Sequence, residues 1–291
     1  MTQVFINVLI AASIYILVGI SFSMIYSTAR FFHFAHGAVF TYGAYGAWLA
    51  KVYLGFPILI SVCSGVVVAA AVGVGLELLI YRPLRRKGTG ALVLLLASLG
   101  MYVVLQNVLS LAFGDETRDL SFGTIQAGIR ILGARITVVQ LITICTGILS
   151  VAGISIIMRK TRLGIALRGM ANDSELAAVS GIYVDRALVF AFVTASALAG
   201  FAGILAAADT YMTPVMGLNA LMMGVVSVFL GGIGRLNAVA LGALLLALSQ
   251  NLGAWLAGAQ WQECIAFLVL LVFLLVRPEG FLGRKAKKAT A

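Results

Sequence analysis

The chain has 291 residues, of which 62% are hydrophobic and only 10% are charged, and its mean hydropathy is +1.09. Soluble domains are about half apolar and about one quarter charged, so this composition excludes a water-soluble globule and predicts an all-α polytopic membrane protein. Eight or nine spanning helices of about 20 residues each leave only short loops, which excludes an attached soluble catalytic domain. We expect residues 1–291 to form a single transmembrane domain.

Apolar runs predict seven membrane spans, at residues 4–27, 57–80, 91–113, 137–158, 187–208, 236–256 and 262–276. Two further stretches, 31–51 and 217–233, are rich in glycine, which weakens a helix. Non-helical backbone is tolerated inside a membrane only against protein or a water-filled cavity. We therefore expect one or both stretches to be broken or re-entrant helices, with nine helices if both cross the bilayer.

Basic residues fall mainly on one side of this predicted topology. With nine spans, sixteen of the twenty lysines and arginines share a side with the 82–90 loop, counting a basic tail at residues 277–291. Short positive loops stay in the cytoplasm, so we expect the N-terminus outside and the C-terminus inside. The net charge of +10 thus lies beside the lipid bilayer and does not indicate a nucleic-acid partner.

Two loops are longer than a simple connection requires. Residues 114–136 form an outer loop, in which apolar and polar residues alternate at 121–132 and indicate a small hairpin or an amphipathic segment. Residues 159–186 form an inner loop, in which the Asn-Asp-Ser run at 172–174 can cap a short helix that ends near Gly181. A helix this short is not stable alone. It therefore lies on lipid headgroups or docks onto a cytoplasmic partner.

Five groups of motifs occur in order along the chain. They are Phe-Ala-His-Gly at 34–37 with Tyr-Gly-Ala-Tyr at 42–45; Tyr-Arg-Pro-Leu-Arg at 81–85; Thr-Arg-Leu-Gly-Ile-Ala-Leu-Arg at 161–168 with Ala-Ala at 177–178 and Ala-Leu-Ala-Gly-Phe-Ala-Gly at 197–203; Gly-Gly-Ile-Gly at 231–234; and Arg-Pro-Glu-Gly-Phe-Leu-Gly at 277–283. In these motifs the chain resembles the permeases of branched-chain amino acid ABC transporters, specifically the smaller, LivH-type subunit. His33 stands where that family usually has asparagine, and Ala38 where it has an acidic residue. These departures leave the substrate open among branched-chain amino acids, other amino acids, urea and short amides.

The resemblance implies an importer subunit of the bacterial inner membrane that works by alternating access. No GxxxxGK[ST] sequence is present, so we expect this chain to bind no cofactor and the ATP to be used by separate cytoplasmic ABC ATPase subunits. The family also implies a second, homologous permease and a periplasmic substrate-binding protein. The 159–186 segment would be the ATPase-coupling loop, with the contact made by Arg168, Asn172, Asp173, Glu175, Ala177, Ala178 and Gly181. In the outer loop Asp115, Glu116, Arg118 and Asp119 either dock the binding protein or form a solvated surface.

Ionisable groups in the membrane are candidates for the substrate pathway. His33 and His36 are three residues apart, which predicts that they are neighbours on one helix face. They either line the pathway or are held by backbone hydrogen bonds at an irregular turn. Most glycines are expected at close helix contacts, but those at 224–234 are dense enough to break a helix and expose its backbone. The candidate pathway residues are His33, His36, Gly37, Gly224, Gly231 and Gly232.

Motifs for catalysis or metal binding are absent from the sequence. Neither GxSxG nor HExxH occurs, so we expect no enzymatic activity and no catalytic residue. Cys63, Cys145 and Cys264 lack a CxxC spacing and are expected to be buried, and we expect no metal site. An ion-gradient-driven transporter or channel and a structural membrane subunit remain alternatives. The form of the 159–186 loop favours the ABC permease.

Overall fold

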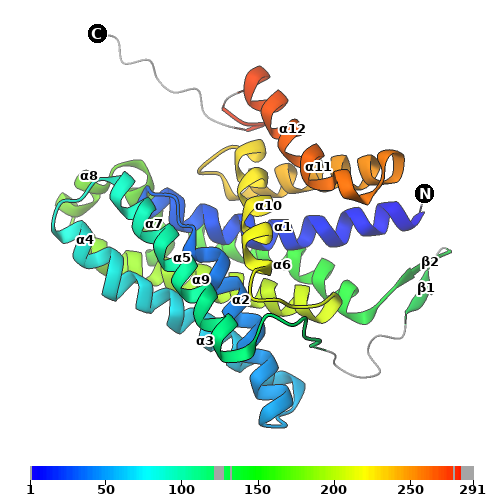
Figure 1. Cartoon of the computed structure of the whole chain (residues 1–291). Helices are drawn as coiled ribbons and strands as arrows, with labels where there is room; N and C mark the ends of the chain where they lie inside the picture. The colour runs from blue at the N-terminus through cyan, green and yellow to red at the C-terminus, as the bar shows by residue number, and fades with distance from the viewer. Residues whose placement is uncertain (1, 121–127, 132, 278, 283–291) are drawn as a thin grey trace.

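Seven helices in the described part of the chain are long and apolar enough to cross a bilayer. The computed structural model describes residues 2–120, 128–131, 133–277 and 279–282, so most of the predicted basic tail at 277–291 lies outside the described residues. The spanning helices are α1 (Thr2–Ala29), α3 (Ile58–Leu76), α5 (Ala91–Phe113), α6 (Val138–Lys160), α9 (Val184–Asp209), α11 (Leu236–Ala257) and α12 (Gln262–Val276). A π-helical turn at Glu77–Tyr81 and α4 (Arg82–Arg86) prolong α3. The prediction of a polytopic all-α membrane protein is confirmed (Figure 1).

Shorter helices complete the fold. The two glycine-rich stretches form α2 (Ala35–Trp48), which a π-helical turn prolongs to Tyr53, and α10 (Met216–Gly231). The inner loop holds α7 (Arg162–Asn172) and α8 (Ser174–Val179), and the outer loop holds a hairpin of β1 (Ile129–Ile131) and β2 (Ala134–Ile136). The hairpin begins within the predicted 121–132 segment, at β1, and extends beyond it to β2, while residues 121–127 and 132 lie outside the described residues.

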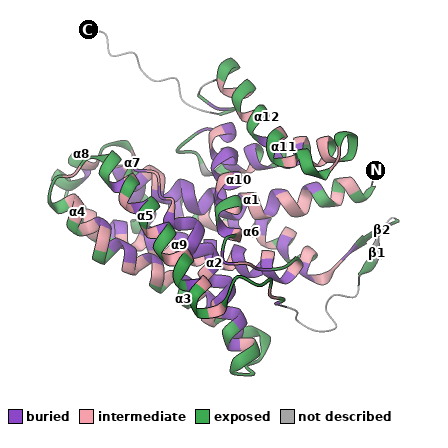
Figure 2. Ribbon diagram, viewed as in Figure 1, coloured by how far each residue is buried: buried purple, intermediate pink, exposed green. Residues whose placement is uncertain are grey.

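Burial divides the helices into a centre and a periphery. Most of α1 and α9 is buried, whereas α5, α6 and α12 expose most of their apolar side chains (Figure 2). Cys63, Cys145 and Cys264 are exposed on peripheral helices, so the expectation that they are buried is wrong. The physical reason is that lipid is as apolar as a protein core, so a small apolar side chain in a span need not face inward.

The connection between α1 and α2 turns back into the membrane domain. His36, in the first turn of α2, contacts Ser21 of α1 (2.8 Å), which lies eight residues before the end of α1. At 1.5 Å per residue, α2 therefore starts about 12 Å inward from that end. The non-helical backbone between the two helices is covered by protein, as Phe31 and His33 are buried. The expected re-entrant segment at 31–51 is thus present, although only its first residues are non-helical.

Glycines allow other backbones to approach α2 from several sides. The Cα and carbonyl of Gly200 on α9 occupy the space that a Cβ on Gly43 would need. The carbonyl of Gly43 in turn occupies the Cβ space of Gly65 on α3. These contacts confirm that glycines here serve close helix packing. They enclose α2 between α3 and α9, with α5 and α10 also touching it.

The second glycine-rich stretch, at 217–233, is less broken than the sequence predicts. α10 continues without a break through Gly224 and ends at Gly231, where Gly232 adopts a φ of +111°. Gly224 packs on Val18 and Gly19 of α1. The expected break at 224–234 is therefore confined to the end of α10, because each earlier glycine is at a helix contact that keeps the helix intact.

Adding a single methyl group at Gly43 tests the close packing of α2 against α9. Gly43→Ala should lower the free energy of unfolding by about 1–3 kcal/mol, since overpacking a close contact costs this much. Thermal unfolding in detergent measures the change. Gly75→Ala is the matched control, because a Cβ at Gly75 of α3 meets no atom within 4 Å. Equal stability of the two variants would contradict the assigned role of Gly43.

Candidate functional site

The α7–α8 hairpin is set by two N-caps and one glycine. The Thr161 hydroxyl accepts a hydrogen bond from the Gly164 backbone N–H (3.0 Å) at the start of α7. Asp173 Oδ1 accepts from the backbone N–H groups of Glu175 (2.9 Å) and Leu176 (3.0 Å) at the start of α8. Gly181, just after α8, has a φ of +85°, which only glycine adopts readily. The predicted cap at 172–174 and the predicted stop at Gly181 are confirmed.

One face of this hairpin exposes large apolar side chains. Leu176 is 64% exposed, Val179 is 87% exposed and Tyr183, which follows α8, is 72% exposed. The candidate contact residues that are exposed are Arg168, Asn172, Asp173, Glu175, Ala178 and Gly181. Ala177, in contrast, is buried among the residues of α7 and α9. It therefore holds α8 on the domain and does not lie on the exposed face.

Arg30 joins the end of α1 to the end of α7. Its Nη2 donates to the carbonyl oxygens of Ala171 (3.2 Å) and Asn172 (2.8 Å). These carbonyls lie in the last turn of α7, where oxygens lack intrahelical partners and a cation is favoured. Arg30 itself has a φ of +55° and is the one described non-glycine residue with positive φ. Its strained backbone aims the side chain at α7.

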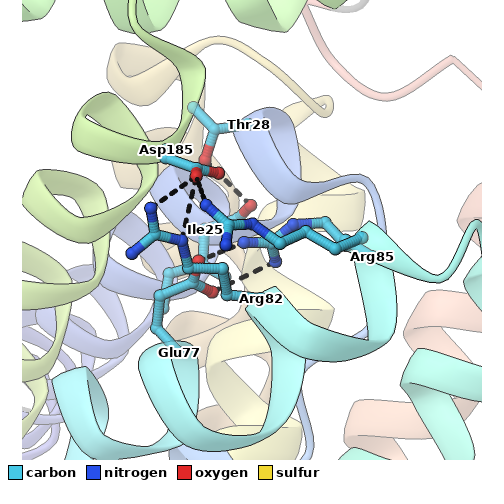
Figure 3. Close-up of polar contacts among 7 residues, drawn as sticks. Ile25, Thr28, Glu77, Arg82, Arg85 and Asp185 are labelled. Carbon is cyan, nitrogen blue, oxygen red and sulfur yellow. Dashed lines mark hydrogen bonds and ion pairs between the residues drawn. The ribbon is translucent and has the colours of Figure 1, made fainter.

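Two ion pairs connect the α3–α4 end to the start of α9. Asp185 Oδ2 accepts from Arg82 Nη2 (2.6 Å) and Nε (2.9 Å) and from Arg86 Nη2 (2.9 Å). Asp185 is in the first turn of α9, where a carboxylate is also stabilised by the helix dipole. Figure 3 shows this carboxylate facing Arg82 beside the last turns of α1, at Ile25 and Thr28.

Glu77 forms a third ion pair, with Arg85, which lies eight residues further along the same prolonged helix. The Glu77 side chain is fully buried, whereas Arg85 retains 20% exposure. From the sequence alone, neither Glu77 nor Asp185 is assigned a partner across the fold. The sequence does contain a signal for the Glu77 pair. Glu77 is a carboxylate inside a predicted span and shortly before a basic loop, and a charge buried there requires a partner.

The two histidines come together at the re-entry of the chain. Tyr81 and Ser98 contact Nδ1 of His33 (both 3.1 Å), and the Ser98 hydroxyl also accepts from the Ala35 backbone N–H (3.0 Å). The rings of His33 and His36 are 5.6 Å apart. His33 precedes α2, so the expectation that both lie on one helix face is wrong, and the turn itself brings the rings together.

Each histidine keeps one ring nitrogen without a partner in the described structure. These atoms are Nε2 of His33 and Nδ1 of His36, and both are buried. The bonds that do form go to side-chain hydroxyls of Ser21, Ser98 and Tyr81. Neither histidine lines the two cavities described next. Gly37 packs against the Gly217 backbone at the same place.

An inner cavity of about 1010 Å³ lies at the end of the fold that carries α7. It is bounded by the C-terminal turns of α1 and α6, the end of α7 and the α10–α11 connection. The charged side chains among its described lining residues are all arginines: Arg30, Arg159, Arg168 and Arg235. Basic residues from distant parts of the chain thus gather at one end of the domain.

An outer cavity of about 500 Å³ lies along the N-terminal half of α1. The N-terminus of α6, the C-terminus of α9 and the first half of α10 form its other walls. Its polar lining comprises Asn7, Tyr15, Gln140, Thr143, Asp209, Thr210, Tyr211 and Asn219. Asp209 is the one charged residue among the lining residues that the structure describes.

A packed seam separates the two cavities. Along α1 the outer cavity ends at Tyr15 and the inner one begins at Ser23, and the intervening residues 17–22 are all buried. Gly19 packs against Gly224 and Val239 at this level. Gly224, Gly231 and Gly232, predicted on the substrate pathway, line neither cavity. The described residues therefore form a domain that is closed between its two cavities.

Arg118 in the outer loop is held by protein contacts. Its guanidinium carbon lies 4.6 Å from the ring centroid of Trp48, and its side chain donates to the Phe113 carbonyl. Its backbone pairs with Met212 through two 2.9 Å hydrogen bonds. Asp115, Glu116 and Asp119 are exposed. The outer loop thus presents carboxylates, while Arg118 holds the loop against the domain.

Comparison with known families matches residues 4–274 to the family described as "Branched-chain amino acid transport system / permease component". The chain belongs to this family. The high-affinity branched-chain amino acid transport system permease protein BraD of Pseudomonas aeruginosa is 31% identical, covering 97% of this chain and 95% of the relative. The corresponding protein LivH of Escherichia coli (strain K12) is 30% identical, covering 94% and 92%.

Among solved structures the permease resembles one described as PsaBC from Streptococcus pneumoniae in complex with Fab. The TM-score is 0.55 over 94% of this chain and 91% of that chain, at 14% sequence identity. This likeness supports the fold. The family resemblance predicted from the sequence motifs is confirmed, as the curated relatives are transport permeases.

The buried ion pair of the permease predicts unequal effects for two neighbouring arginines. Arg85→Ala should lower the free energy of unfolding by about 3–5 kcal/mol, because it leaves the Glu77 carboxylate buried and unpaired. Arg86→Ala should cost at most about 1 kcal/mol, since Arg86 is 65% exposed and exposed pairs contribute little. Chemical unfolding in detergent gives both values. A loss at Arg86 as large as at Arg85 would refute this assignment.

Proposed function

We propose that the chain is the transmembrane permease subunit of an ABC importer for branched-chain or similar amino acids. Membership of the permease family and the names of the curated relatives support this function. In this proposal the chain itself binds no cofactor and catalyses no reaction. ATP is used by separate cytoplasmic ATPase subunits, whose movement switches the permease between outward and inward access.

The exposed apolar face of the α7–α8 hairpin is the observation that carries the ATPase contact. Leu176, Val179 and Tyr183 expose most of their surface at a loop, and exposed apolar patches rimmed by polar residues mark protein contacts. Asp173 and Glu175 supply the polar rim. A lipid-facing surface helix usually carries basic residues beside its apolar face, whereas α8 (SELAAV) carries none. A protein partner therefore fits this face better than lipid headgroups.

The proposed orientation places this hairpin in the cytoplasm. Arg30, Arg159, Arg168 and Arg235 meet around the inner cavity, and this clustering of basic residues is typical of the cytoplasmic side of a membrane protein. The N-terminus is then outside and the C-terminus inside. Gln3 contacts the backbone of Arg135 at the opposite end, which agrees with an outer position of both.

Two further partners complete the proposed importer. A second, homologous permease would cover exposed apolar surface of this chain, and a periplasmic substrate-binding protein would dock on the outer loop. For the binding protein the carboxylates of Asp115, Glu116 and Asp119 are available. Arg118 is left out of this surface because its side chain is packed on Trp48.

Uptake measurements decide the energy source. In cells that make this chain together with its cognate subunits, uptake of labelled leucine should stop on ATP depletion and should persist when the proton gradient is collapsed. Labelled urea, measured in parallel, tests the amide alternative that the sequence leaves open. Uptake that requires only the proton gradient would reject the ABC importer in favour of a secondary transporter.

Two changes in α8 test the coupling contact. Ala178→Trp should abolish uptake while the protein remains folded in the membrane, because Ala178 is exposed and the indole would block close approach of the ATPase. Asp173→Lys should do the same by reversing the charge at the rim. Asp173→Ser, which retains a capping oxygen for α8, separates loss of the cap from loss of the contact. Ala257→Trp, an exposed position at the far end of α11, is the control. Normal uptake by Ala178→Trp would reject the docking surface.

A further inference from the structure

The outer cavity has the chemistry of an amino-acid site. We propose that it receives the transported amino acid, with Asp209 binding the ammonium group and an apolar wall holding the aliphatic side chain. This inference rests on the proposed function and specifies a substrate subsite within it. The cavity volume of about 500 Å³ lies within the range of small-molecule sites.

Asp209 is placed where a cation is needed. It is the last residue of α9, so its carboxylate adds to the negative end of the helix dipole. Among the described residues no lysine or arginine lies within 4 Å of it. Gln140, a neutral amide, lines the same cavity. The cavity therefore presents a negative charge that no protein cation neutralises.

The wall below this carboxylate is apolar. Ile14, Phe40, Leu205 and Met223 line the cavity together with Asp209. A metal ion would gain nothing from these side chains and a polyamine would leave a second ammonium group unpaired, whereas a leucine-like side chain would bury its surface there. A phosphate-bearing ligand would be repelled by the carboxylate. The pairing of one negative charge with an aliphatic wall selects an amine that carries an apolar group.

Neutral donors are available for the carboxylate of a zwitterion. Asn7 accepts from Gln3 through Oδ1 (3.1 Å), and its Nδ2 donates to none of the described residues. Met216 and Asn219 bring the first turn of α10 to the cavity wall, and no side chain caps that helix. α9 therefore ends and α10 begins at the same cavity. The two helix termini offer opposite partial charges to the two ends of a zwitterion.

The charge of Asp209 is tested by Asp209→Asn in the complete importer. Uptake of labelled leucine should fall about tenfold or more, because a charge-assisted hydrogen bond is lost. Glu279→Gln removes one negative charge at an exposed residue on the other end of the domain, and it should leave uptake unchanged. Unaltered uptake by Asp209→Asn, with ATP-driven uptake by the wild type, would overturn the site and leave the proposed function standing.

Thiol labelling measures directly whether leucine occupies the outer cavity. Thr210→Cys, in the full chain with Cys63, Cys145 and Cys264 changed to serine, places a thiol on the cavity wall. In proteoliposomes leucine should slow its modification by a membrane-impermeant thiosulfonate several-fold. N-acetylleucine, which lacks the ammonium group, should not, and Asp209→Asn should remove the protection.

Each result of the labelling experiment has one meaning. Protection by leucine that persists in Asp209→Asn would overturn the ammonium contact, and equal protection by N-acetylleucine would do the same. Protection by sodium or putrescine alone would replace the amino-acid site by a cation site and so overturn the proposal. Failure of the importer function appears instead as wild-type uptake that is independent of ATP, which this labelling does not measure.

Discussion

The requirement that backbone inside a membrane be enclosed by protein determines the centre of this fold. The chain leaves α1, runs back beside it, and starts α2 at the level of Ser21, so unpaired N–H groups of a helix start lie within the domain. Ser98 satisfies one of them, at Ala35, and surrounding helices exclude lipid. Glycines at 43, 65 and 200 permit that enclosure because any larger side chain would separate the helices.

Much of this arrangement was predictable from the sequence, because lipid imposes a length and a composition on each span. The seven long helices, the re-entry near residue 31 and the caps of α8 follow from local patterns. The pairing of Asp185 with Arg82 does not, since it depends on which helix ends meet. The cysteines were misassigned for a related reason: apolar residues in a span carry no sequence signal for facing lipid or protein.

The candidate sites likewise combine features that the sequence predicts with features that only the fold shows. Capping chemistry located the coupling hairpin, but only the fold separates the exposed Ala178 from the buried Ala177. The glycines at 224 and 231 have the density of a broken helix, yet they pack on α1 and α11. The two cavities had no sequence signal at all, since each combines residues from four or more distant segments. Asp209 is a helix-end residue in the sequence, and its unpaired charge becomes apparent only beside the apolar wall.

α1 connects the coupling hairpin, the closed seam and both cavities. Its last residue is followed by Arg30, which binds the final carbonyls of α7. Its residues 23–27 line the basic inner cavity, residues 17–22 form the seam, and residues 7–15 line the acidic outer cavity. A rigid shift of α7 would therefore reach α1 through Arg30, alongside the helices α6 and α9 that pack on α7 directly. At the seam the side chains of Val18 on α1 and Val228 on α10 pack beside Gly224 and Gly19, so the two helices interlock there and a shift of α1 is transmitted to α10. The same glycines that close the domain thus also couple α1 to α10.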